Sequence, residues 1–149
     1  MKVKDCMCGD ICVCTPDNSV CDCAKVMNDN HIGCVPVCDL DDKVVGLITD
    51  RDIVLRCIAN GKDPKNTKIS EVMTCNICCC KPEQDIEDAE KDMSQIQIRR
   101  VPVVDENSKI IGIISLGDLA KNKNVSKEEV GETVENICNC TKTNIKNCD

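Results

Sequence analysis

Two hydroxyl–carboxylate pairs are the residues in this chain whose types and spacing could do chemistry. Thr49 is followed three positions later by Asp52, and Ser115 is followed in the same way by Asp118. A hydroxyl at the start of a helix lies beside unpaired backbone N–H groups and the positive end of the helix dipole, where a phosphate can bind. A carboxylate one turn later can accept hydrogen bonds from both hydroxyls of a ribose. The same pattern also occurs as a plain helix cap, so a purely structural role for either pair stays open.

Both pairs lie at matching places in an internal repeat. Residues 3–57 align with residues 69–123 without a gap. The matched positions include Met7 and Met73, Pro16 and Pro82, Pro36 and Pro102, and Gly46 and Gly112. A fixed period indicates one supersecondary unit used more than once, in which each copy cannot bury its apolar face alone. Two copies favour a closed pair related by a pseudo-twofold axis.

The pattern of each half predicts a short amphipathic turn, at 3–7 or 69–73, followed by elements in the order β-α-β-β-α. In the first half we expect strands at 11–14, 34–38 and 44–48, and helices at 20–30 and 50–58. In the second half we expect strands at 77–80, 100–104 and 110–114, and helices at 86–96 and 116–121. The predicted fold class is therefore α/β (α+β), with two pseudo-twofold related repeats packed sheet to sheet in one globule.

Helix starts and apolar stripes support these ranges. Ser19 and Asp85 are suitable N-caps, each with an aspartate three positions later. The apolar positions of the first helix follow the spacing of a helix buried on one face. These positions are Val20, Cys23, Ala24 and Met27. The proline in each Val-Pro-Val segment predicts a sheet edge or a bulge.

The predicted domain organisation follows the repeat. Residues 1–58 form the first repeat, 59–68 a polar linker, and 69–123 the second repeat. Residues 124–149 form a helix that starts at Ser126, with Glu129 completing a capping box, and a polar, frayed tail.

Composition excludes several classes of protein. The formal net charge is −7, whereas proteins that bind nucleic acid normally carry a basic stripe. No apolar run approaches the roughly 20 residues that span a bilayer. The first residues also lack the apolar core of a signal peptide, so we expect a cytoplasmic protein without membrane contact.

The chain has sixteen cysteines and no aromatic residue. Most cysteine pairs are separated by one residue, whereas structural zinc sites favour two or more residues between paired ligands. We therefore interpret the cysteines as small packing residues in a reducing compartment. The alternative is metal binding or redox sensing. The densest cluster for that alternative is Cys75, Cys78, Cys79 and Cys80.

The segments 46–52 and 112–118 resemble the Gly-h-h-[Ser/Thr]-x-x-Asp signature of cystathionine β-synthase (CBS) domains. The Val-Pro-Val-x-Asp segments at 35–39 and 101–105, and the methionine near each repeat start, fit the same family. The resemblance covers about residues 3–123 in both copies. Members of this family work as tandem pairs, often called Bateman modules, which bind adenosine compounds and act as regulatory sensors.

The resemblance implies a ligand site in each copy. It gives Thr49 and Ser115 a role at phosphate, and Asp52 and Asp118 a role at ribose. The adenine would lie in an aliphatic slot along the strands that follow the first helix of each repeat. The residues of that slot would be Cys34, Val35 and Pro36 in one copy, and Val101 and Pro102 in the other. Arg100 could offset phosphate charge, and Arg51 lies inside the first signature, where the second copy has Gly117.

The leading functional hypothesis is a sensor that binds AMP, ADP, ATP or S-adenosylmethionine between the two repeats and reports it to an unidentified regulated protein. No catalytic set is evident, so we expect no enzymatic activity and no required cofactor. The alternatives are a cysteine-based metal or redox sensor on the same scaffold, and an interaction module without a ligand.

Two further expectations concern the oligomeric state and the role of Asp52. The stripe of the first helix and a second stripe, Ile53, Val54 and Cys57, predict a homodimer, because they hold more apolar surface than one chain need expose. Asp52 is expected to lie past the helix cap and to face the ligand. Its replacement should then cost little stability.

Overall fold

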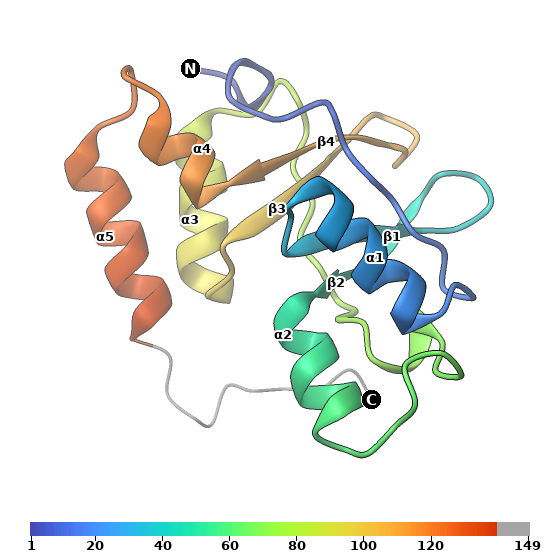
Figure 1. The fold of residues 1–149 in the computed structure, drawn as a ribbon. Coiled ribbons are helices and arrows are strands. Elements are labelled where there is room, and N and C mark those ends of the chain that lie inside the picture. Colours follow the sequence, from blue (N-terminus) through green and yellow to red (C-terminus); the bar gives the residue numbers. More distant parts are fainter. Residues whose placement is uncertain (140–149) are drawn as a thin grey trace. The chain divides into compact units, whose positions relative to one another are not determined.

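The computed structural model describes residues 1–139, and these divide into two compact units. One unit contains residues 12–77, and the other combines residues 1–11 with residues 78–139. Each unit has one antiparallel pair of strands with helices packed beside it (Figure 1). The mixture of helices with two small sheets confirms the predicted α+β class.

The unit of residues 12–77 is built on the antiparallel strands β1 (Cys34–Cys38) and β2 (Val44–Thr49). Helix α1 (Val20–Asn30) packs against β1 and against the π-helical turns η2 (Ile53–Ile58). The short helix α2 (Asp50–Asp52) joins β2 to η2, and a 3-10 turn, η3 (Ile69–Glu71), follows the linker. All five residues of β1 are buried, so this strand lies at the centre of the unit.

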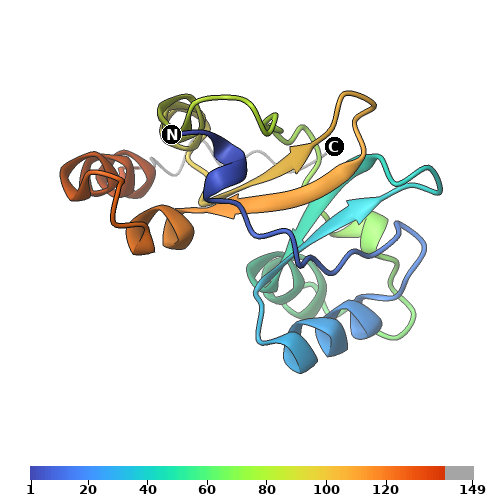
Figure 2. The ribbon, with the colours of Figure 1, turned by 90° about the horizontal axis from the view of Figure 1, so that it is seen from above.

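The second unit repeats this arrangement and adds a helix. Strand β3 (Arg100–Val104) pairs with β4 (Ile110–Ser115). Around them lie the 3-10 turn η1 (Val3–Asp5), α3 (Ile86–Ile96), α4 (Leu116–Lys121) and α5 (Lys127–Cys138). Helix α5 packs against α3 and α4, as the view from above shows (Figure 2). Each strand pair carries a register shift one residue after its proline, which confirms the predicted bulge.

Single-residue bridges extend both strand pairs. Cys14 forms a parallel bridge with Val37, and Thr74 forms an antiparallel bridge with Leu47 on the other edge. Cys80 and Cys8 make the equivalent bridges in the second unit. The predicted strands at 11–14 and 77–80 are therefore wrong, because only their last residue joins the sheet. The backbone N–H and carbonyl of that one residue satisfy groups beside the bulge, and the preceding residues form no ladder.

The compact units do not follow the order of the chain. The segment that opens the second repeat, from η3 to Ile77, packs in the unit of the first repeat. Residues 1–11, which open the first repeat, pack in the unit of the second. Each unit therefore combines one repeat's helices and strands with the opening turn of the other. This exchange brings Thr74 to the first signature and Cys8 to the second repeat's sheet.

Most predicted helices have the expected bounds, with two differences. The predicted helix at 50–58 is helical throughout but becomes π-helical from Ile53 on. Ser19 caps α1 by accepting a hydrogen bond from Asp22 N (3.0 Å), as predicted. Asp85 occupies the N-cap position of α3, but its carboxylate forms an ion pair with Lys2 (2.9 Å) instead of a cap bond. The predicted frayed tail lies almost entirely outside the described residues.

Each unit has its own aliphatic core. Val20, Cys23, Ile53 and Cys57 lie inside the core of the first unit, so the stripes that predicted a homodimer mostly face inward. The large apolar side chains that η2 does expose are Val54, Leu55 and Ile58. A homodimer therefore stays a prediction that sedimentation can test, with η2 as its candidate surface. Within residues 1–139, no helix is both long enough and apolar enough to cross a membrane.

A buried carboxyl lies on α3, the helix that packs against α5. Glu90 is 6% exposed, and its Oε1 has no hydrogen-bond partner among the described residues. Burial raises the pKa of Glu90, and the nearby carboxylates of Glu129 and Glu87 raise it further. A carboxyl with a raised pKa in the folded state favours folding when protonated and opposes it when ionised.

We expect Glu90→Gln to stabilise the protein at pH 7 by about 1 kcal/mol, because it removes a buried, unpartnered charge. This corresponds to roughly 2–4 °C in the midpoint of thermal unfolding. The gain should shrink as the pH falls through the raised pKa, where Glu90 becomes neutral in the wild type. Thermal scans at pH 7 and near pH 4.5, with the exposed Glu132→Gln as control, measure both effects. A gain that is independent of pH would contradict this assignment.

Candidate functional site

The first hydroxyl–carboxylate pair lies where β2 passes into α2. Thr49 Oγ1 accepts a hydrogen bond from Asp52 N (3.0 Å), and Thr49 N donates to Asp52 Oδ2 (3.0 Å). These two bonds form a reciprocal capping box, which satisfies two backbone N–H groups at the start of the helix. The structural role that the sequence left open for this pair is therefore present.

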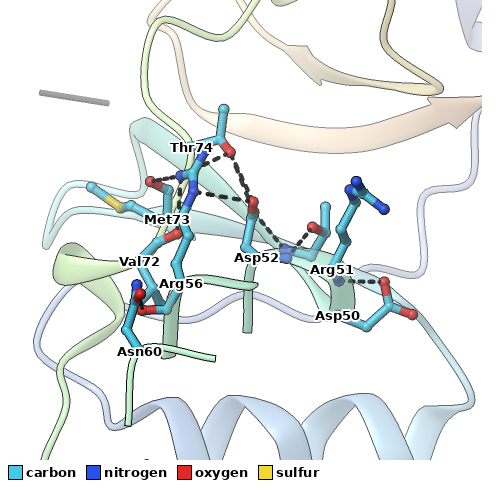
Figure 3. Close-up of polar contacts among 9 residues, drawn as sticks. Asp50, Arg51, Asp52, Arg56, Asn60, Val72, Met73 and Thr74 are labelled. Atoms are coloured by element: carbon cyan, nitrogen blue, oxygen red, sulfur yellow. Dashed lines mark hydrogen bonds and ion pairs between the residues drawn. The ribbon is translucent and has the colours of Figure 1, made fainter. Parts of the chain in front are cut away.

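Two further side chains bind the Asp52 carboxylate. The hydroxyl of Thr74 lies 3.3 Å from Oδ1 and 3.2 Å from Oδ2 (Figure 3). The guanidinium of Arg56 lies on the same side, with Nε 3.9 Å from Oδ1. Arg56 Nη1 also donates to the carbonyls of Val72 (3.2 Å) and Met73 (3.0 Å). Asp52 therefore joins α2 and η2 to the segment that carries Thr74.

The expectation that Asp52 lies past the helix cap is wrong, because its side chain is part of the cap. Asp52 is the third residue of α2, where its carboxylate closes the capping box, and it is only 9% exposed. The short α2 turns its carboxylate back toward the strand end, where Thr49 N, Thr74 and Arg56 surround it. Its removal therefore affects folding as well as any ligand.

The second pair has the same cap but fewer neighbours. Ser115 N and Ser115 Oγ both contact Asp118 Oδ2, at 2.8 Å and 2.6 Å, and Asp118 N donates to Ser115 Oγ (3.1 Å). Asp118 is only partly buried. Among residues 1–139, no other side chain donates a hydrogen bond to its carboxylate.

The strands place the other predicted site residues beside these caps. Cys34 pairs with Thr49 across β1 and β2, and Arg100 pairs with Ser115 across β3 and β4. Directly paired residues of antiparallel strands lie on the same face of the sheet. Each hydroxyl therefore has a defined neighbour, a thiol in the first repeat and a guanidinium in the second.

The remaining predicted residues are less available. Val35 and Val101 are fully buried in their cores. The carbonyls of Pro36 and Pro102 already accept hydrogen bonds from Cys14 N (3.0 Å) and Cys80 N (2.9 Å). These side chains and carbonyls shape the strand rather than present free groups.

The cations at the two signatures also differ. Arg51 is exposed on α2, and Arg100 is half-buried on β3. No ion pair or hydrogen bond of either guanidinium occurs within the described part of the chain. Arg99, next to Arg100, is exposed as well, so the second repeat carries two adjacent arginines beside its signature.

Comparison with known proteins identifies the family. The model of the CBS domain matches residues 3–58 and again residues 69–124. The chain belongs to the CBS domain family. It contains two CBS domains, each ending in one of the hydroxyl–carboxylate signatures.

The relatives of this CBS pair include proteins of similar length. The CBS domain-containing protein YhcV of Bacillus subtilis is 39% identical over 136 residues, which cover 91% of this chain and 94% of the relative. The crystal structure of the CBS domain protein TA0289 of Thermoplasma acidophilum, described as of unknown function, has a TM-score of 0.82 at 28% identity. It covers 93% of this chain and 77% of TA0289.

A third similar protein was solved with ligands. The CBS domain pair of protein MJ0100, in complex with 5-methylthioadenosine and S-adenosyl-L-methionine, has a TM-score of 0.74 at 28% identity. The alignment covers 81% of this chain and 98% of that structure. A protein with a fold similar to that of this chain therefore binds adenosine compounds.

The cysteines of this CBS pair do not form a metal centre in the described residues. Within residues 1–139, no group of three or more His, Cys, Asp or Glu side chains is placed to hold a metal ion. Burial raises the pKa of the Cys78 thiol to about 11 and that of Cys80 to about 12, with smaller contributions from neighbouring Asp92 and cysteines. Burial also raises the pKa of Cys79. A raised pKa makes each of these thiols a weaker nucleophile at neutral pH than a thiol of ordinary pKa.

Sequence reasoning missed Thr74 and Arg56. Arg56 had a detectable signal, because it lies four positions after Asp52, where a carboxylate and a cation meet on a helix. No sequence signal linked Thr74 to Asp52. Thr74 belongs to the second repeat by sequence, and it reaches Asp52 because the opening turn of that repeat packs in the unit of the first.

Proposed function

We propose that this CBS pair is a non-catalytic sensor that binds an adenosine compound, and that its two hydroxyl–carboxylate signatures are the candidate sites. The observation that carries the proposal is the matched placement of Ser115 with Asp118, and of Thr49 with Asp52, at the strand-to-helix junctions of two CBS domains. The structure of MJ0100 with S-adenosylmethionine and methylthioadenosine supports adenosine as the common part of the ligand.

The chemistry of the described residues suits binding rather than catalysis. The carboxylate can accept ribose hydroxyls, and the adjacent arginines Arg99 and Arg100 can neutralise a phosphate or a carboxylate. The only histidine in the sequence, His31, is exposed at the C-cap of α1. The ligand would act by changing the stability or surface of the CBS pair, which a regulated partner then detects.

We expect one member of a panel of AMP, ADP, ATP and S-adenosylmethionine to raise the midpoint of thermal unfolding. A ligand that binds only the folded state adds about 2.7 kcal/mol to the free energy of unfolding at a hundredfold excess over its Kd. Differential scanning fluorimetry at 1–2 mM ligand measures the shift, with guanosine nucleotides as the control for the base. No shift with any adenosine compound at millimolar concentration would contradict the proposal.

A further inference from the structure

The two signatures differ in what already occupies the carboxylate. Both oxygens of Asp52 are engaged: Oδ2 by Thr49 N and the Thr74 hydroxyl, and Oδ1 by the same hydroxyl and the Arg56 guanidinium. The carboxylate is also almost fully buried. A ribose would have to displace the Thr74 hydroxyl or the Arg56 guanidinium to reach it, and the displaced group would lose its charged partner.

Asp118 keeps one oxygen available. All the hydrogen bonds to its carboxylate from residues 1–139 end on Oδ2, and both come from Ser115. Oδ1 accepts none within this part of the chain. Because Asp118 is only partly buried, this oxygen can accept ribose hydroxyls without breaking the cap.

Two substitutions between the repeats explain the difference. Cys8 lies where the first unit has Thr74, and its thiol contacts the carbonyl of Asp10 (3.5 Å). Asn122 lies where the first unit has Arg56, and its amide contacts the sulfur of Cys6 (2.9 Å). Neither side chain bonds to Asp118.

The residue paired with the signature hydroxyl also differs between the repeats, and this difference again favours a ligand at the second signature. Arg100 is the strand partner of Ser115, and its guanidinium forms no ion pair with residues 1–139. The matching partner of Thr49 is Cys34, which is buried and uncharged as a thiol. The second repeat therefore offers a free carboxylate oxygen and a cation on one side of its sheet, a combination that matches the ribose and phosphate of a nucleotide.

We infer that the chain binds one adenosine nucleotide, at the Ser115–Asp118 signature, and that Thr74 and Arg56 close the Thr49–Asp52 signature by occupying its carboxylate. This inference rests on the proposed function, because it selects one of two candidate sites for the same ligand. Thr74 and Arg56 are then positioning residues of the fold, and Asp118 and Arg100 are the ligand contacts.

Isothermal titration calorimetry with AMP, ADP, ATP and S-adenosylmethionine tests the stoichiometry directly. The wild type should bind one equivalent per chain. Asp118→Asn should weaken binding about tenfold or more, because a charged acceptor is lost. Asp52→Asn should leave the affinity within about threefold. Arg100→Gln should weaken AMP more than S-adenosylmethionine, which carries no phosphate.

A second test exchanges the residues beside the two carboxylates between the repeats, and its expected result is a gain of binding rather than a loss. Arg56→Asn combined with Thr74→Cys gives the first signature the residues of the second, and should add a second, weaker binding event. Cys8→Thr combined with Asn122→Arg should instead lower the affinity of the one existing site. Circular dichroism and a thermal scan show whether each variant is folded. If a double variant is unfolded, the comparison of the single variants Asp118→Asn and Asp52→Asn decides the question.

The outcomes separate this inference from the proposed function. If no adenosine compound binds the wild type, the proposed function fails and the inference fails with it. If the wild type binds two equivalents, or if Asp52→Asn abolishes binding while Asp118→Asn does not, the proposed function stands and the inference is overturned. One equivalent that only Asp118→Asn removes supports both.

Discussion

Asp52→Ala should lower the free energy of unfolding by about 2–4 kcal/mol, whereas Asp118→Ala should lower it by only about 1 kcal/mol. Both changes remove the acceptor that completes a capping box. The change at Asp52 also leaves the Arg56 guanidinium and the Thr74 hydroxyl without their carboxylate, and Arg56 is largely enclosed by its own unit. Removing one partner of a buried charged group costs more than an exposed pair is worth.

Urea unfolding at pH 7 measures the two losses on the same scale. Asp50→Ala serves as the matched control, because Asp50 is exposed on the same helix turn and, within residues 1–139, its carboxylate accepts only a bond from Arg51 N (2.9 Å). We expect a loss below 1 kcal/mol there. Equal losses for Asp52→Ala and Asp118→Ala would show that Thr74 and Arg56 add nothing to the first signature.

Local signals were sufficient for the regular elements. The bounds of α1 and α3 are those predicted, because a cap or a cap-like residue marks each start and an apolar stripe with helical spacing marks each length. The pairing of β1 with β2 also follows from the polar turn between two apolar runs. The same signals located Thr49 and Ser115 at strand ends, which is where the structure has them.

Non-local pairing was beyond the reach of these signals. The two repeats have the same pattern, so the sequence cannot tell whether an opening turn packs on its own repeat or on the other. A swap leaves every local periodicity unchanged, yet it decides whether Thr74 or Cys8 lies beside Asp52. The predicted strand at 11–14 failed for a related reason, because an apolar run forms a ladder only where its backbone meets a partner strand, and here only Cys14 does so.

Most residues of the apolar stripes are buried, but in the core of their own unit. Cys23 and Met27 pack inside the unit of the first repeat, so they cannot also form the predicted dimer surface. The exposed side chains Val54 and Leu55 lie on η2, where the helix widens to the π form and its faces no longer follow a period of 3.6 residues. The predicted stripe therefore combines two core residues, Ile53 and Cys57, with the exposed Val54.

The opening turn of each unit rests on a glycine of the central strand pair. A Cβ at Gly46 would lie 2.9 Å from the Thr74 carbonyl oxygen and 3.0 Å from the Met73 sulfur. Leu47 and Thr74 exchange two backbone hydrogen bonds beside it, at 3.0 Å and 2.7 Å, so the carbonyl cannot withdraw without breaking the bridge. At Gly112 the same contact involves Cys8 O (2.9 Å) and the Met7 sulfur (2.8 Å).

We therefore expect Gly46→Ala to destabilise the chain by about 2–3 kcal/mol, because the new methyl group must displace backbone rather than a flexible side chain. Gly131→Ala on α5 is the control, since a Cβ there would meet no atom of residues 1–139 within 4 Å apart from its chain neighbours and its own helix backbone, and alanine should stabilise that helix by about 0.5–1 kcal/mol. Urea unfolding of both variants gives the two signs. A neutral Gly46→Ala would mean that the segment carrying Thr74 is loosely held, and the closure of the first signature by Thr74 would then lose its structural basis.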